Sequence, residues 1–200
     1  MTAAVHRVLL VRHGNTFGPG DVVTRVGART DLPLTPSGIA QAQALGALFH
    51  QSAETIAQAY CSPLRRTRET AEHILAAVGS AAPLRVAPAL TEIDHGPDEN
   101  RPEADVVARI GEEALRRWEE DAVPPPGWLI DPAAAAQGWR ALLDEGQPGE
   151  TRLIVTSNGI ARFALAAYGR APLPKLRTGA FGVIVFENGE PTLTDWDRRP

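Results

Sequence analysis

The chain of 200 residues has one cysteine, one lysine, no excess of positive charge and no long apolar run. A single cysteine, Cys61, cannot form an internal disulfide, which is typical of proteins from a reducing compartment. The apolar stretch before Arg12 is too short for a signal peptide or a membrane span, so we predict a cytoplasmic protein that does not act at a membrane. A net charge of −4 argues against nucleic acid as the main partner. The chain has 19 arginines and a single lysine, Lys175, and we draw no function from this bias.

The sequence also has no obvious cluster of metal ligands, no internal repeat and no low-complexity segment. Hydrophobic residues make up 44% of the chain and charged residues 22%, as in ordinary globular proteins. Two hundred residues suffice to bury a large core, so we predict a single domain over residues 1–200. Within it, residues from about 97 to 147 are predicted to form a helical insertion that covers the substrate.

Short apolar segments alternate with segments of helical periodicity, which indicates a layered α/β fold. We predict strands at residues 6–12, 59–61, 84–86 and 153–156, and a terminal hairpin of residues 181–186 and 192–196. We predict helices at residues 39–49, 64–78, 101–120, 133–143 and 160–168, with Thr35 and Pro36 at the start of the first. A Pro-rich connector at residues 122–132 separates two of these helices.

The first strand ends abruptly in Arg12, His13 and Gly14. The Val and Leu residues before them fit an interior strand, and ligands of open α/β sheets bind beyond the carboxyl ends of such strands. Arginine presents a planar charged fork that suits phosphate, and histidine can attack phosphorus to form a covalent intermediate. The tripeptide alone is also compatible with a polar turn that has no chemistry, so it needs partners elsewhere in the chain.

Three further segments supply such partners. Residues 61–72 read Cys-Ser-Pro-Leu-Arg-Arg-Thr-Arg-Glu-Thr-Ala-Glu, residues 90–96 read Leu-Thr-Glu-Ile-Asp-His-Gly, and residues 153–159 read Leu-Ile-Val-Thr-Ser-Asn-Gly. In this order, and together with the stretch from Gly27 to Gln43, they resemble the histidine phosphatase (phosphoglycerate mutase-like) superfamily. The resemblance covers most of the chain and is weakest between residues 97 and 147. It implies a three-layer α/β/α fold with a central, mostly parallel mixed sheet.

A phosphate monoester carries two negative charges, so its cleavage depends on positioning and charge neutralisation. The resemblance implies that neutral His13 attacks phosphorus to give a phosphohistidine, while Arg12 and Arg66 clamp the phosphate. Two adjacent guanidinium groups should lower the pKa of His13. Because the arginines supply the positive charge, we expect no metal and no other cofactor.

Two of these assignments have competitors in the sequence. The family motif Ser-Pro-Leu-x-Arg begins at Ser62 and ends at Arg66, and a helix start that turns Arg66 inward turns Arg68 away. The alternative is that the arginines of this run line a solvated helix face. Glu92 matches the family's general acid and base, which protonates the leaving oxygen and later activates water. Asp94 is its nearest competitor, with Asp98 and Glu99 behind it.

Asn158 is the largest departure from the family pattern. Many members have a second His immediately before the glycine that matches Gly159, and that His contacts the phosphate. An Asn amide still donates a hydrogen bond, and the Gly159 N–H can bind anions, but Asn carries no charge. Because one lost oxyanion donor costs about 2.7–4 kcal/mol and this exchange keeps a donor, we predict a weakened phosphatase. His95 and Arg162 are candidates to compensate, and a purely structural loop role for His95 is equally open.

The substrate side is less defined by the sequence. We place Asn15 and Arg29 among the substrate-binding residues, although Arg29 is equally compatible with a surface charge. The stretch from Gly96 to Asn100 departs from the family's Gly-x-Trp-Glu-Gly, which puts the shape of the pocket in doubt. We predict a small phosphorylated metabolite or a phosphoprotein as substrate. The apolar terminal hairpin can pair across a homodimer.

Three functions are open at this point. Hydrolysis is favoured over mutase activity because a mutase must exclude water while it holds the phosphoryl group, and mutase relatives usually have longer chains with an extra covering segment. A phosphate-binding protein without catalysis is the third, suggested by Asn158. The joint presence of His13, Arg12, Arg66 and Glu92 argues against it.

Overall fold

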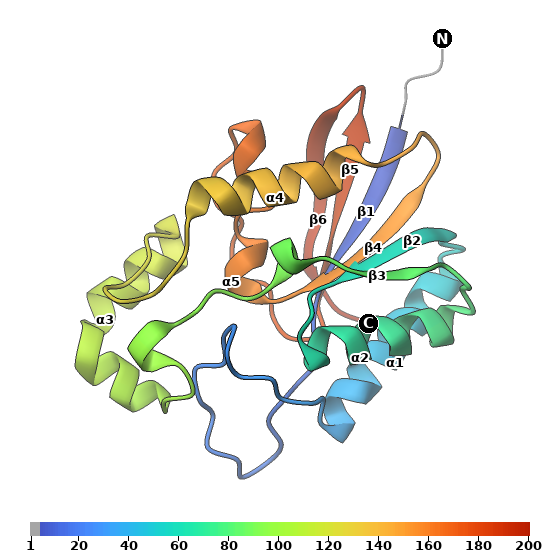
Figure 1. Cartoon of the computed structure of the whole chain (residues 1–200). Helices are drawn as coiled ribbons and strands as arrows, with labels where there is room; N and C mark the ends of the chain where they lie inside the picture. Colours follow the sequence, from blue (N-terminus) through green and yellow to red (C-terminus); the bar gives the residue numbers. More distant parts are fainter. Residues whose placement is uncertain (1–4) are drawn as a thin grey trace.

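The centre of the molecule is a six-stranded mixed sheet, shown in Figure 1 by a computed structural model that describes residues 5–200. The strand order is β3 (Leu84–Val86), β2 (Ile56–Cys61), β4 (Thr151–Thr156), β1 (Val5–Arg12), β5 (Phe181–Glu187) and β6 (Glu190–Arg198). The first four of these strands run parallel, whereas β5 is antiparallel to β1 and β6 to β5. The predicted α/β class and the mostly parallel mixed sheet are thereby confirmed.

Side chains of β1 alternate between two separate cores. Leu9 and Val11 pack with α1 (Pro36–Gln51) and α2 (Arg65–Val78) on one face of the sheet, and Val8 and Leu10 pack with α4 (Pro132–Asp144) on the other. All four side chains are at most 1% exposed. An apolar run without polar alternation is what a strand covered on both faces requires. The three layers follow from this double coverage (Figure 1).

The start of α1 lies against the end of β1. Thr35 caps the helix as predicted, since its Oγ1 accepts the Gly38 N–H at 3.2 Å, and Pro36 is the first helical residue. A Cβ at Gly14 would lie 2.4 Å from the Gly38 carbonyl oxygen. The glycine therefore lets the backbone that follows β1 touch the helix, and this contact fixes the position of His13.

The helix predicted at residues 160–168 is wrong. The structure has a short helix, α5 (Asn158–Ala161), then tight turns and the 3₁₀ helix η3 (Ala166–Tyr168). The Arg162 carbonyl accepts the Leu173 N–H at 2.9 Å, so the Ala166 N–H bonds to Phe163 instead. A long-range backbone contact thus replaces an α-helical bond.

Residues 103–144 form two helices, of which α3 (Glu103–Asp121) contributes Glu103, Trp118 and Glu119 to the wall of the site. In α3, Gly111 has φ 79° and ψ 157°, so the single helix predicted here is kinked. A turn-rich connector leads to α4, and α3 stands to the side of the sheet, away from α1 and α2 (Figure 1). The other 3₁₀ helices are η1 (Pro88–Leu90) and η2 (Gly96–Asp98). No helix within residues 5–200 has the length and apolar character needed to cross a membrane.

Candidate active site

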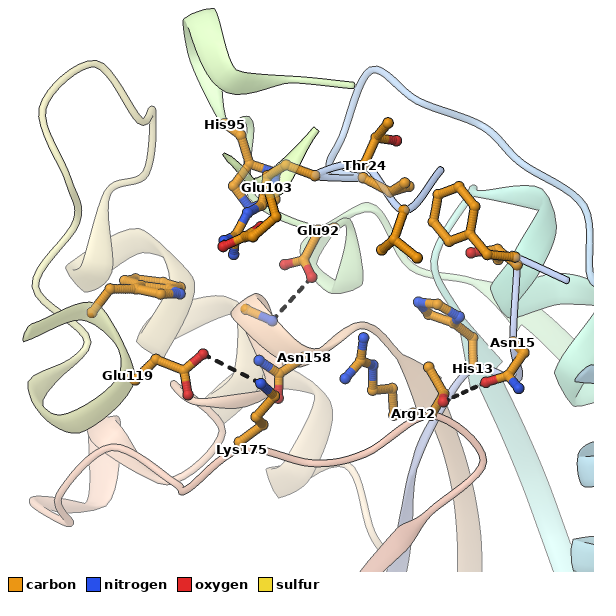
Figure 2. Close-up of a pocket in the computed structure, with 18 residues that line it drawn as sticks. Arg12, His13, Asn15, Thr24, Glu92, His95, Glu103, Glu119, Asn158 and Lys175 are labelled. Atoms are coloured by element: carbon orange, nitrogen blue, oxygen red, sulfur yellow. Dashed lines mark hydrogen bonds and ion pairs between the residues drawn. The ribbon is translucent and has the colours of Figure 1, made fainter. Parts of the chain in front are cut away.

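A cavity of about 620 Å³ opens where β1 and β4 end, as predicted for an α/β sheet. Arg12 pairs with Thr156 in the sheet, and the His13 N–H donates to the Thr156 carbonyl at 3.0 Å, so the segments that follow the two strands lie side by side. Figure 2 shows their side chains facing one space. The lining includes Arg12, His13, Asn15, Phe17, Val23, Arg25, Glu92, His95, Trp118, Glu119, Asn158, Gly159 and Lys175.

His13 is held in one orientation with one nitrogen available. Its Nδ1 lies 2.8 Å from the Gly14 carbonyl oxygen. Because a carbonyl only accepts, Nδ1 carries the proton, and Nε2 of the neutral ring keeps its lone pair. Burial, with Arg66 and Arg12 nearby, lowers the pKa of His13 well below its ordinary value of 6.5. The expected neutral imidazole is therefore what this environment favours at pH 7.

Arg12 lies beside His13 on the cavity wall. Its Nη1 donates to the Leu176 carbonyl at 2.7 Å, which fixes the guanidinium. Burial lowers its pKa to about 10, against the attraction of Glu92, so the group stays charged at neutral pH. The remaining N–H donors of the Arg12 guanidinium are suited to an anionic oxygen.

Arg66 lies behind the cavity. As predicted, it points inward while Arg65 and Arg68 are exposed. Its side chain is 0% exposed and donates to the carbonyls of Thr30 at 2.7 Å and Gly27 at 3.2 Å, and it does not line the cavity. In this structure Arg66 thus acts on His13 through its charge and holds the loop of residues 27–30.

Glu92 lies on the cavity wall and is bound by backbone N–H groups. Its Oε1 accepts from Ile93 at 2.9 Å and Ile160 at 3.0 Å, and its Oε2 accepts from Gly159 at 3.0 Å. The Gly159 N–H, expected to bind the substrate anion, is therefore already used by Glu92. Asp94 does not line this cavity; it pairs with Arg29, Nε to Oδ2 being 2.9 Å. Position favours Glu92 over Asp94 as the proton donor.

Asn158 faces the cavity and also holds the loop before β5. Its Oδ1 accepts the Leu176 N–H at 2.8 Å. The amide NH₂ is then the donor that this side chain can offer to the cavity. Beside it, Lys175 Nζ lies 3.4 Å from Glu119 Oε1 (Figure 2). Lys175 and Glu119 were not predicted, and the one sequence signal for them was that Lys175 is the only lysine.

The two predicted substrate-binding side chains differ in their placement. Asn15 lines the cavity, but its amide is bound to Ser37 at 3.3 Å and to Thr178 at 2.5 Å. Arg29 lies outside the cavity, with 57% of its side chain exposed and its Nη2 on the Gly96 carbonyl. The surface-charge alternative fits Arg29 better in this structure.

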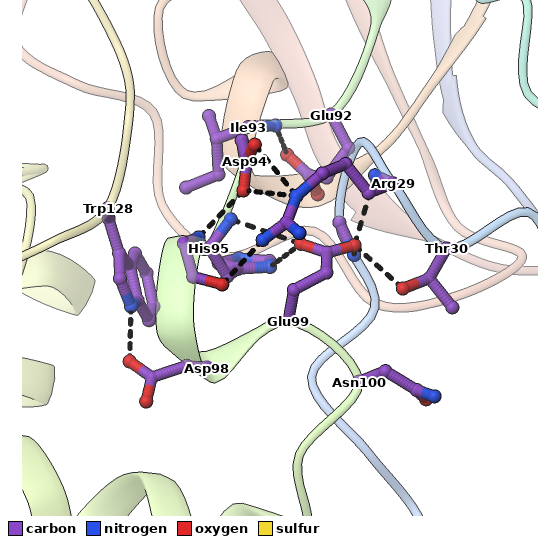
Figure 3. A network of polar contacts seen from close by, with 12 residues as sticks. Arg29, Thr30, Glu92, Ile93, Asp94, His95, Asp98, Glu99, Asn100 and Trp128 are labelled. Carbon is purple, nitrogen blue, oxygen red and sulfur yellow. Dashed lines mark hydrogen bonds and ion pairs between the residues drawn. The ribbon is translucent and has the colours of Figure 1, made fainter.

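The stretch from Gly96 to Asn100 is built around the carboxylate of Glu99, which the sequence placed behind Asp94 as a competitor for the proton donor (Figure 3). Glu99 accepts from Thr30 Oγ1 at 2.7 Å, from the Gly27 N–H at 2.9 Å and from the His95 N–H at 3.1 Å. Burial alone would raise the pKa of Glu99, but these bonds and the nearby His95 ring lower it to about 2. Glu99 therefore ties the loop of residues 27–30 to the acid segment.

His95 and Arg162, the two candidates to compensate for Asn in place of the second His, lie at different positions relative to the cavity. His95 lines the cavity, 5% exposed, and meets the Trp128 ring edge-on at 4.4 Å. Arg162 is 1% exposed, does not line the cavity, and donates to the Glu119 carbonyl at 2.5 Å. Among residues 5–200, no three His, Cys, Asp or Glu side chains are grouped as metal ligands would be.

The family model of the histidine phosphatase superfamily (branch 1) matches residues 8–199. The chain belongs to this superfamily. The 2,3-bisphosphoglycerate-dependent phosphoglycerate mutase of Mesorhizobium japonicum is 28% identical over 196 residues, which cover 93% of this chain and 94% of that protein.

Two solved phosphatase structures share the fold. A mycobacterial glucosyl-3-phosphoglycerate phosphatase is 21% identical with a TM-score of 0.79, covering 96% of this chain and 99% of that one. The alpha-ribazole phosphatase of Shigella flexneri is 26% identical with a TM-score of 0.73, covering 96% of each chain. Because the mutase relative matches over nearly its full length, the predicted difference in chain length does not separate mutases from hydrolases here.

Proposed function

We propose that the protein hydrolyses phosphate monoesters through a phosphohistidine on His13. The observation that carries this proposal is the bond from His13 Nδ1 to the Gly14 carbonyl, which leaves Nε2 as the nucleophile inside a cavity shared with Arg12 and Glu92. A neutral imidazole, a fixed guanidinium and a carboxyl group are what the two steps of such a reaction require. The substrate class is a small phosphorylated metabolite or a phosphoprotein.

In the first step, Nε2 of His13 forms a bond to phosphorus while the bond from phosphorus to the leaving oxygen breaks. Glu92, in its acid form, gives its proton to that oxygen. Arg12 neutralises charge on the phosphoryl oxygens, and the buried charge of Arg66 acts from behind the imidazole. The products of this step are the free alcohol and a phosphoryl group on His13.

In the second step, water replaces the imidazole at phosphorus. Glu92, now a carboxylate, takes a proton from the water as the new P–O bond forms and the N–P bond breaks. Phosphate leaves, His13 regains its lone pair and Glu92 regains its proton. The cycle thus restores both groups without a metal or an organic cofactor.

Phosphoryl transfer back to a bound acceptor is the second candidate. It is favoured by the relative in Mesorhizobium japonicum that is named as a mutase and matches 94% of its own length. The chemistry up to the phosphohistidine is the same, so the two functions differ in whether water or a second hydroxyl attacks.

The test is phosphate release from p-nitrophenyl phosphate and a panel of phosphometabolites, with EDTA present. We expect turnover by the wild type and none by His13→Ala. His50→Ala, which removes an exposed histidine on α1, should match the wild type. A parallel assay follows isomerisation of phosphoglycerates primed by a bisphosphate. Undiminished phosphate release by His13→Ala would refute the proposal, and isomerisation without release would favour the mutase.

A further inference from the structure

Three basic side chains, Arg12, Arg25 and Lys175, line the cavity, and one of them is weakly held. Arg25 is ion-paired with Glu103 and lies over the Trp128 ring, 5.2 Å from its centroid. Arg12 is fixed on a backbone carbonyl at 2.7 Å. By contrast, the Lys175 ammonium has a single contact, 3.4 Å from Glu119, and 57% of its side chain is exposed. This distance is longer than the ~2.7–2.9 Å of a strong charge-assisted bond.

The backbone places Lys175 close to the inner end of the cavity. The next residue, Leu176, donates its N–H to Asn158 Oδ1 at 2.8 Å and accepts from Arg12 Nη1 at 2.7 Å. Standard backbone dimensions then place the Lys175 Cα within about 5 Å of Asn158 Oδ1. The flexible four-carbon stem of a lysine spans such a distance. The ammonium can therefore reach a group bound between Arg12 and Asn158.

A phosphate monoester bound in the cavity requires a second cation to balance its charge. A phosphate monoester brings two negative charges into the cavity. Arg12 is the one fixed cation on the wall beside His13, since Arg66 is 0% exposed with donors on the Thr30 and Gly27 carbonyls. Asn158 offers an amide donor without charge. An ammonium arriving from Lys175 would balance the second negative charge.

We propose that Lys175 is a catalytic residue whose ammonium leaves Glu119 when substrate binds and then contacts a phosphoryl oxygen beside Asn158. This inference rests on the proposed function, because it assigns a residue to the same phosphoryl site. Lys175 keeps its proton throughout and forms no covalent bond. Glu119 holds the ammonium at the wall, 3.4 Å away, and competes with the phosphoryl group for it.

The test compares Lys175→Met, Lys175→Arg and the wild type in two measurements. The first is the dissociation constant for inorganic phosphate by titration calorimetry, and the second is kcat and KM for p-nitrophenyl phosphate. Because a hydrogen bond to a charged group is lost, we expect Lys175→Met to bind phosphate roughly tenfold to hundredfold more weakly and to lose a similar factor in kcat/KM. Lys175→Arg should stay within about threefold of the wild type. Arg116→Met is the control for lost charge, since Arg116 pairs only with Glu113 and Glu120 on its own helix.

A double variant separates contact from simple neutralisation of Glu119. If Lys175 only cancels that charge, Lys175→Met combined with Glu119→Gln would recover wild-type phosphate binding. If Lys175 contacts the phosphoryl group, the double variant stays weak. Recovery in the double variant, or unchanged binding and turnover in Lys175→Met, would overturn the inference.

Failure of the proposed function gives a different result. A wild type that turns over no substrate, or a His13→Ala variant that keeps turnover, would refute the hydrolase. Calorimetry of Lys175→Met is independent of turnover, so it still decides whether the lysine contacts bound phosphate when the hydrolase is refuted.

Discussion

Replacement of Glu92 by Gln tests two features together: the proposed proton donor and the three backbone N–H groups that bind its side chain. Oε1 accepts two N–H groups and Oε2 accepts one, from Gly159. A Gln oxygen can keep the two bonds of Oε1, but its NH₂ then faces the Gly159 N–H. A buried donor left without a partner costs about 1–3 kcal/mol. Since Glu92 is 8% exposed, little of this loss is screened by water.

We expect Glu92→Gln to lower the free energy of unfolding by roughly 2 kcal/mol, which corresponds to a fall in Tm of about 4–8 °C for a domain of this size. Turnover of alkyl phosphates should fall roughly 10²-fold to 10⁴-fold, because the leaving alkoxide needs a proton. Turnover of p-nitrophenyl phosphate should fall less, since nitrophenolate leaves without one.

The assays are thermal unfolding by circular dichroism and phosphate release from both substrates. Glu112→Gln is the matched control, because Glu112 is exposed on α3, and it should change neither quantity. An unchanged Tm in Glu92→Gln would refute the claim that the backbone N–H groups bound to Glu92 stabilise the fold. Equal losses on both substrates would refute the role of Glu92 as proton donor.

Three further predictions concern pH, the competing carboxylate and a close backbone contact. Burial and two arginines hold the pKa of His13 well below 6.5, so protonation of His13 should not lower kcat/KM until the pH is below 6.5. A pKa of His13 at or above 6.5, measured by NMR, would contradict this. The unfolded chain protonates His13 more readily, so stability falls as the pH drops below about 6.5, and His13→Gln should reduce that fall in pH-dependent unfolding. Asp94→Asn should leave kcat within about twofold, since it loses only a half-exposed ion pair outside the cavity, and a hundredfold loss in the phosphate assay would contradict the placement. Gly27→Ala should destabilise the protein by about 1–3 kcal/mol, because its Cβ would lie 2.3 Å from Glu99 Oε2, whereas Gly18→Ala, with its nearest atom at 3.5 Å, should be neutral in the same melting experiment.

The sequence predicted the core of the site because its residues follow strand ends. Arg12 ends one parallel strand, His13 comes directly after it, and Asn158 follows the neighbouring strand, so the sheet alone brings them together. The inward turn of Arg66 follows from helical spacing in the same way. Both predictions depend on local sequence patterns within regular strands and helices, and tertiary contacts leave those positions unchanged.

The parts that the sequence did not predict depend on contacts between distant segments. Arg29 turns to Asp94, 65 residues away, and this removes it from the cavity. The Arg162 carbonyl is taken by Leu173, which ends a helix that its own residues favour. Lys175 belongs to no motif, and its place at the site depends on the bond between Leu176 and Asn158. Partners of this kind are set by the tertiary structure.

The most direct test of the hydrolase is detection of the phosphoryl group on His13. Wild-type protein is mixed with a slow phosphomonoester, quenched in alkali, in which phosphohistidine is stable, and digested for mass spectrometry. The account predicts one phosphoryl group per chain on the peptide that contains His13, formed at least as fast as turnover and absent from His13→Ala. Turnover without any phosphorylated histidine, or with the phosphoryl group on another residue, would contradict it.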